Sequence, residues 1–233
     1  MKRFLELFLS IILIITLHGC RSNDVDVKKA SNTYRDLIKL VDESEIDFKS
    51  EEQKKIKVET NQRILNEYID TVNNKNYTFE YVMLGLGENN QLSKVYRTQS
   101  QDNYIEINII SADDDNPDTI FKYAYINDIY YNYFDDGINE PQIKKSTDND
   151  NKNSLFNSLF NDLSYLATYT VQLNKKDYVC EVWKSSKGKD LEFYFRNNQL
   201  VGIKYQASDN VVLKYHILSF SKMAEPQNIK IPK

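Results

Sequence analysis

The sequence predicts an α+β fold in which a curved antiparallel sheet, a half-barrel, is covered on one face by helices. Most of the chain from residue 77 onward consists of short runs in which apolar and polar residues alternate, as in half-buried strands. Other segments repeat apolar residues every three or four positions, as helices do. Short polar connections join the later strands, which favours hairpins between neighbours. One large sheet with helices packed on it satisfies the order helix, strands, helix, strands.

The first 30 residues are predicted to be a secretion signal followed by a tether. Residues 1–3 carry two cations, residues 7–17 are almost wholly apolar, and Gly19 and Cys20 follow. The apolar run is too short for a membrane span, which needs about 20 residues, and the arrangement is typical of a signal peptide. We therefore expect a cleaved signal at residues 1–19, a flexible lipidated tether at 20–30, and one domain at 31–233.

Helical periodicity predicts the helices of this domain. Leu37, Ile38 and Val41 indicate a short first helix. A capping-box pattern at Ser50 and Gln53 then precedes apolar positions that recur every four residues to Val72, which predicts a helix of about 20 residues. A further amphipathic helix is predicted from Asn153 or Ser154 to Leu166. Its apolar stripe consists of Leu155, Phe156, Leu159, Phe160, Leu163 and Leu166.

Alternating runs predict the strands. Before the last helix they lie near residues 77–83, 105–109, 121–125 and 129–133, with Asn127 and Asp128 as a hairpin turn. The polar tract at residues 144–153 is expected to be a loop. After the last helix, five runs near residues 171–173, 178–182, 191–195, 201–205 and 211–217 predict a meander of antiparallel hairpins.

Charge and chemistry exclude several function classes. The chain has 34 acidic and 30 basic residues, and its net charge of −4 argues against a nucleic-acid partner. Outside the signal, His216 is the only histidine, which we expect to face outward, and Cys180 is the only thiol left if Cys20 is modified. The acidic stretches at residues 113–118 and 135–140 do not match a calcium-loop pattern. We expect no cofactor, no metal and no catalytic residues; a hydrolase is the weakest alternative.

Two stretches resemble known families. Leu17-His18-Gly19-Cys20 resembles the lipobox of bacterial lipoproteins, although His18 replaces the usual small or β-branched residue. The resemblance implies a diacylglyceryl group on Cys20, which would anchor the protein to the outer face of the cell membrane. The helix ending ILNEYIDTVNNKNYTFEY and the closing meander to NIKIP are similar to the LolA/LppX-like half-barrel lipoproteins. That resemblance implies an open-sided barrel whose apolar cavity binds lipid or an acyl chain.

Ten apolar residues are the candidate lining of such a ligand cavity. They are Phe79, Tyr81, Ile107, Tyr123, Phe156, Leu159, Phe160, Leu163, Phe193 and Phe195. The alternative is that these side chains simply fill the core, because apolar stripes at helical spacing usually serve packing. The domain would then be a non-enzymatic interaction or sensor module that presents tyrosine-rich strands to another surface protein.

Overall fold

A single twelve-stranded antiparallel sheet dominates the computed structural model, which describes residues 33–84, 91–113, 115–147, 159–208 and 211–232. The strand order is β1-β8-β9-β10-β11-β12-β2-β3-β4-β5-β6-β7. The strands are β1 (Glu52–Val58), β2 (Asn76–Leu84), β3 (Leu92–Ser100), β4 (Asn103–Ser111), β5 (Thr119–Ile126), β6 (Ile129–Asp135), β7 (Gln142–Ser146), β8 (Leu163–Leu173), β9 (Lys176–Ser185), β10 (Asp190–Arg196), β11 (Gln199–Ser208) and β12 (Val211–Ser221). The predicted α+β class with one curved antiparallel sheet is confirmed.

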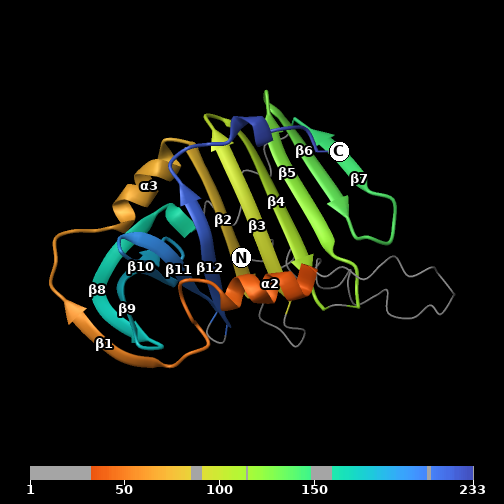
Figure 1. The fold of residues 1–233 in the computed structure, drawn as a ribbon. Helices are drawn as coiled ribbons and strands as arrows, with labels where there is room; N and C mark the ends of the chain where they lie inside the picture. Colours follow the sequence, from red (N-terminus) through yellow and green to blue (C-terminus); the bar gives the residue numbers. More distant parts are fainter. Residues whose placement is uncertain (1–32, 85–90, 114, 148–158, 209–210, 233) are drawn as a thin grey trace.

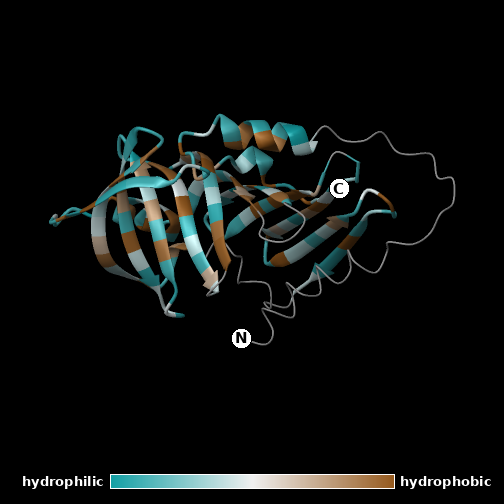
Figure 2. Cartoon of the chain, turned by 90° about the horizontal axis from the view of Figure 1, so that it is seen from below, coloured by the Kyte–Doolittle hydropathy of each residue, from teal (hydrophilic) through white to brown (hydrophobic). Residues whose placement is uncertain are grey.

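The sheet has two parts of different shape (Figure 1). Strands β2–β7 form a nearly flat panel, here called the flat half, whereas β1 and β8–β12 bend round into what we call the curled half. The helical elements whose bounds lie within the described residues are α2 (Thr33–Asp42), α3 (Leu65–Asn73) and the short 3-10 helix η2 (Pro226–Asn228). Apolar and polar residues alternate along many of the strands (Figure 2), so each strand presents different side chains to the two faces.

The helices divide between the two faces of the sheet. Phe79 and Tyr81 of β2 belong to the buried cluster that contains α3, and their face is called the α3 face below. Val82, which points the opposite way, belongs to the cluster that contains Leu37 and Val41 of α2. That side is the α2 face. The helical residues Leu159 and Phe160 also belong to the cluster of the α3 face, so the expectation that the helices cover one face is wrong only for α2.

The α2 face of the curled half is covered by the connection after α2. Ile46 and Phe48 pack there on Tyr178, Cys180 and Tyr194. The Cys180 thiol is fully buried, and burial raises its pKa far above the ordinary value. A thiol that stays protonated is a poor nucleophile.

The long helix predicted from Ser50 is wrong in its first half. Residues 52–58 form the edge strand β1, paired with β8, and only residues 65–73 are helical. Ser50 does not cap a helix; its hydroxyl donates to Asp47 Oδ2 at 2.6 Å. The physical reason is that Ile56 and Val58 alternate with lysines, so the same residues fit a strand once β8 offers pairing partners.

The last predicted helix is also too long. Leu163 and Leu166 lie in β8, and Asp162 has a positive φ of 54°, which is incompatible with a continuing helix. Leu159 and Phe160 are helical, whereas residues 153–158 lie outside the described residues. The helix therefore ends before Asp162.

Besides β1, two further strands were not predicted from the sequence, whereas most of the turns were. Strand β3 was missed entirely, and β7 occupies part of the tract expected to be a loop. The predicted turn at Asn127 and Asp128 is confirmed, with φ values of 51° and 65° that suit a two-residue hairpin. The predicted meander of antiparallel hairpins is confirmed for β8 to β12.

Candidate functional site

Most of the predicted cavity residues converge in one buried aromatic cluster on the α3 face. Phe79, Tyr81, Leu159, Phe160, Phe193 and Phe195 are 0–2% exposed, and Leu163 packs against them. The ring of Phe160 lies 5.9 Å from Phe79 and 6.0 Å from Phe193, measured between centroids. Strand alternation places these rings on one face, and the curl of the sheet brings strands distant in sequence together around Phe160.

The remaining predicted residues do not join this cluster. Tyr123 lies in the flat half on the α3 face, opposite Glu106. Ile107 is opposite Tyr96 and packs in the cluster on the α2 face, so it is separated from the others by the sheet itself. Phe156 and Cys20 lie outside the described residues.

A cleft of about 360 Å³ opens beside Phe160. It is bounded by Ile69 and Asn73 of α3 and by Phe160, Asn161, Asp162 and Leu163. The cleft therefore separates the end of α3 from the segment that inserts Phe160 into the core. Phe160 and Leu163 belong to the aromatic cluster or pack against it, so the cleft adjoins the cluster here.

Helix α3 is held over the cluster by a buried carboxylate. Glu181 of β9 is 1% exposed and accepts the backbone N–H groups of Ile64 and Leu65 at 2.6 and 3.3 Å. It also accepts the indole N–H of Trp183 at 3.1 Å. A carboxylate at a helix N-terminus satisfies free amide donors and suits the helix dipole. The sequence analysis did not identify Glu181 as a functional residue. The feature that could have identified it is its position on the same strand face as the apolar residues Val179 and Trp183.

The hydroxyl of Tyr68 fixes the middle of α3. It donates to the carbonyl of Asn198 at 3.0 Å and accepts the backbone N–H of Leu200 at 2.9 Å. Both partners lie at the β10–β11 hairpin, so α3 is attached to the curled half at two separate points.

A buried charged network adjoins the cluster in the flat half. Arg97 of β3 is 2% exposed and pairs with Glu106 of β4 at 2.9 Å. Its Nε donates to the hydroxyl of Tyr77 at 2.9 Å, and its guanidinium lies 4.1 Å from the ring centre of Tyr104. Burial raises the pKa of Tyr104 to about 12, so this phenol stays protonated. The network is electrically neutral and places no unpaired charge in the interior.

His216 is buried, contrary to the expectation that it faces outward. It lies on the α2 face of β12, and its Nδ1 is 2.8 Å from the hydroxyl of Ser44. Within the described residues its Nε2 has no hydrogen-bond partner. Burial lowers the pKa of His216 to about 4. The Ser44 hydroxyl also contacts the carbonyls of Val41 and Ile46, and among the described residues no carboxylate bonds to the His216 ring. We therefore interpret the pair as an anchor for the connection after α2 rather than as a catalytic relay.

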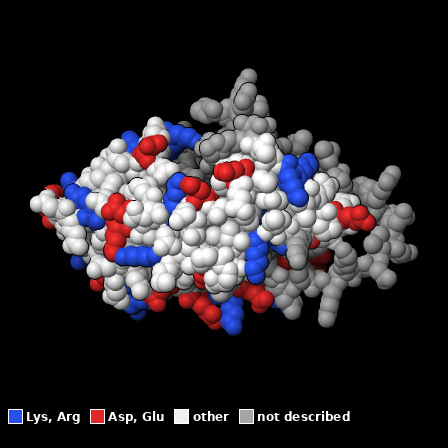
Figure 3. Space-filling view, turned by 90° about the horizontal axis from the view of Figure 1, so that it is seen from above, with Lys and Arg blue, Asp and Glu red and all other residues white. Residues whose placement is uncertain are grey.

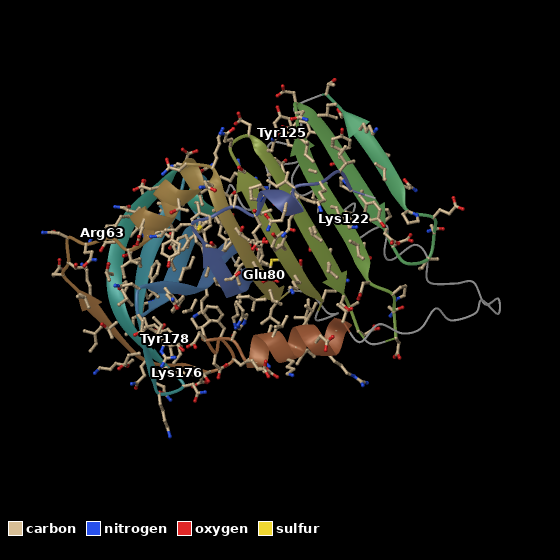
Figure 4. All side chains as sticks on the ribbon, turned by 45° about the horizontal axis from the view of Figure 1, so that its top comes forward. Arg63, Glu80, Lys122, Tyr125, Lys176 and Tyr178 are labelled. Carbon is tan, nitrogen blue, oxygen red and sulfur yellow. The ribbon has the colours of Figure 1, made fainter. Side chains whose placement is uncertain are left out.

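A second cleft lies at the far end of the curled half. It measures about 400 Å³ and is lined by Lys175, Lys176, Tyr178, Arg196 and neighbouring residues. Figure 4 shows Lys176 and Tyr178 at the lower end of the curl, away from Arg63 near the start of α3. This cleft is a surface hollow between hairpins. Of the residues predicted to line a ligand cavity, only Phe195 lines it.

Comparison with known proteins adds no family. No family model matches the chain, and no curated protein matches it significantly. In the part of the chain that the structure describes, no three His, Cys, Asp or Glu side chains are grouped so that they could hold a metal ion. None of the described helices has the length and apolarity needed to cross a membrane.

Proposed function

We propose that this protein is a non-catalytic lipoprotein, anchored outside the cell through Cys20, that binds a lipid or acyl chain in the curled half of its sheet. The observation that supports this proposal is the position of Phe160. Its ring comes from the segment before β8, not from the sheet, yet it lies between Phe79 of β2 and Phe193 of β10. The cleft of about 360 Å³ is lined in part by the same Phe160.

An acyl chain could take the place that the Phe160 ring occupies in the aromatic cluster. Phe160 can leave the cluster without breaking any strand pairing, because it precedes β8 in the chain. An acyl chain that took its place would bury methylene groups, each contributing about 0.8 kcal/mol. The aromatic side chains that remain, Phe79, Phe193 and Phe195, would line the site.

The test is the composition of the purified domain. The chain from residue 21 onward contains every described element and lacks the anchor. Native mass spectrometry and organic extraction should find a co-purifying lipid at a defined stoichiometry, and Phe160→Ala should increase its occupancy. Phe48→Ala is the matched control, because it removes a buried ring from the opposite face. A domain that carries no lipid in either variant contradicts the proposal.

A second candidate is an interaction module with a permanently filled core. It is favoured by neighbouring tyrosines in the flat half: Tyr104 and Tyr125 are half-buried with ring centroids 6.2 Å apart, and Tyr125 packs on the buried Tyr130 at 4.5 Å. Figure 4 labels Tyr125 at the upper end of this half. Tyrosine offers apolar area with a polar tip and is frequent at interfaces. In the view of Figure 3 charges of both signs are interspersed, so the surface gives no single-sign electrostatic signal. This candidate predicts no co-purifying lipid.

A further inference from the structure

The hydroxyl of Tyr215 is buried without a partner in the middle of the aromatic cluster. Tyr215 of β12 is 0% exposed, and its hydroxyl has no hydrogen-bond partner among the described residues. An unsatisfied buried hydroxyl is costly, so such a group calls for an explanation. Two other buried phenols of the same interior are satisfied: Tyr77 bonds to Arg97 and Gln99, and Tyr68 bonds to the β10–β11 hairpin.

A line of ring contacts connects Tyr215 to Phe160. Phe160 contacts Phe79 at 5.9 Å, Phe79 contacts Tyr81 at 5.2 Å, and Tyr81 contacts Tyr215 at 5.4 Å, all between centroids. Register places Phe79 and Tyr81 two residues apart on β2, and Tyr81 is opposite Ile217 on β12. An apolar chain that displaces Phe160 and follows these rings would reach the Tyr215 hydroxyl.

We infer that the Tyr215 hydroxyl is the polar recognition point of the site and that the ligand carries a neutral hydrogen-bond acceptor, such as an ester carbonyl, on its apolar chain. This inference rests on the proposed function. The Tyr215 hydroxyl donates a hydrogen bond to that acceptor. It therefore has a hydrogen-bond partner only when the ligand is bound. Tyr215 therefore determines specificity among apolar ligands.

The charges around Tyr215 favour a neutral acceptor over a carboxylate. Arg97, the buried cation of this face, is already paired with Glu106. Glu106 and Arg97 act on Tyr81 with opposite sign, whereas the charged or phenolic group that acts on Tyr215 is Tyr205, which offers no positive charge. A free carboxylate would lose its hydration here without gaining a cation, which is expensive. An ester loses little hydration and gains one hydrogen bond.

Fluorescence of Trp183 tests the inference. Trp183 is the only tryptophan of the chain and belongs to the same buried cluster. Three brominated probes of equal chain length, a methyl ester, a free fatty acid and a hydrocarbon, should quench it on binding to the domain from residue 21 onward. We expect the ester to bind up to about tenfold more tightly than the other two, because one added hydrogen bond contributes that much. Tyr215→Phe should abolish this preference.

Matched variants separate recognition from stability. Tyr215→Phe should leave the melting temperature unchanged or raise it, since it removes an unsatisfied group, whereas Tyr77→Phe should lower it and keep the ester preference. Equal binding of all three probes by the wild type, or an ester preference that survives Tyr215→Phe, overturns the inference while leaving lipid binding intact. A Tyr215→Phe variant that loses as much stability as Tyr77→Phe overturns it too. Absence of quenching by every probe overturns the proposed function itself.

Discussion

The ring of Phe48 stands directly over Gly202: a Cβ atom at position 202 would lie 2.6 Å from Phe48 Cζ and 2.9 Å from Ile46 Cγ2. Gly202 is the central glycine of β11, paired with Tyr194 and His216 on the neighbouring strands. Because a strand glycine normally weakens a sheet, its place here has a local reason: the backbone must approach the connection after α2 closely. The absent side chain makes room for the aromatic cover of the α2 face.

Gly202→Ala should therefore destabilise the protein. The added methyl group forces Phe48 and Ile46 off the sheet, and overpacking of this kind costs about 1–3 kcal/mol of unfolding free energy. Urea denaturation followed by circular dichroism measures the loss. Phe48→Leu in the same chain should recover part of it, because a shorter side chain accommodates the methyl group; additive losses in the double variant would show that the contact is not the cause.

His216 should make stability depend on pH. Its pKa is lowered to about 4 in the folded protein by burial, from an ordinary value of about 6.5. The unfolded chain therefore binds more protons between these values, so the contribution is fully present above pH 6.5 and is lost as the pH falls towards 4. The loss reaches about 2–3 kcal/mol. Unfolding free energies of wild type and His216→Gln across this range measure it, and parallel curves would refute the assignment.

Glu181→Ala should loosen α3. Three N–H groups lose a buried acceptor, and we expect a loss of about 2–4 kcal/mol, with Glu181→Gln losing less because one acceptor oxygen remains. Hydrogen exchange should accelerate first at the amides of Ile64 and Leu65. Glu80→Ala is the matched control: Glu80 pairs with Lys94 on a partly exposed surface and should change stability by less than about 1 kcal/mol.

Arg97 and Glu106 should behave as one unit. Arg97→Met leaves Glu106 without its cation, and breaking a buried pair costs about 3–5 kcal/mol. The double variant with Glu106→Gln should be less destabilised than the two single losses added together, because neither charge is then left alone. Thermal unfolding of the four proteins gives the coupling, and strict additivity would contradict a shared network.

Cys20→Ser should abolish lipidation. Metabolic labelling with a fatty-acid analogue is expected to tag the wild-type chain and to leave the variant untagged, since the thiol is the site of the thioether. In cell fractionation, the wild type should be found in the membrane fraction and the variant in the soluble fraction. Equal labelling of both chains would show that the resemblance to a lipobox is misleading.

The strands whose apolar residues alternate could be predicted from sequence, and those with polar interiors could not. Tyr178, Cys180 and Val182 alternate plainly, and β9 follows the expectation. In β3, Ser93, Arg97, Thr98 and Gln99 are buried, so the strand has no apolar alternation to detect. Their burial is stabilised by partners on β2 and β4, which are assembled only in the sheet. Strand β1 could not be predicted either, because this exposed, lysine-rich segment becomes a strand only by pairing with β8.

The aromatic residues of the cluster could be identified from the sequence, but the sequence did not show which of them lie together. Strand periodicity identified Phe79, Tyr81, Phe193 and Phe195 because each alternation has only two faces. The order of the strands in the sheet decides which of these residues are neighbours. Strand β12 pairs with β2, which is far away in sequence, and this pairing joins the curled and flat halves. That pairing brings Tyr215 beside Tyr81 and separates Ile107 from the site.

Local patterns, read from the sequence alone, determined the alternating strands, their turns and the α+β class, because each depends on residues a few positions apart. Tertiary structure alone decided where the buried polar groups Glu181, Arg97, His216 and Tyr215 lie. A charged or hydroxyl side chain is buried only where distant strands supply its partners or its enclosure, and no short stretch of sequence contains that information.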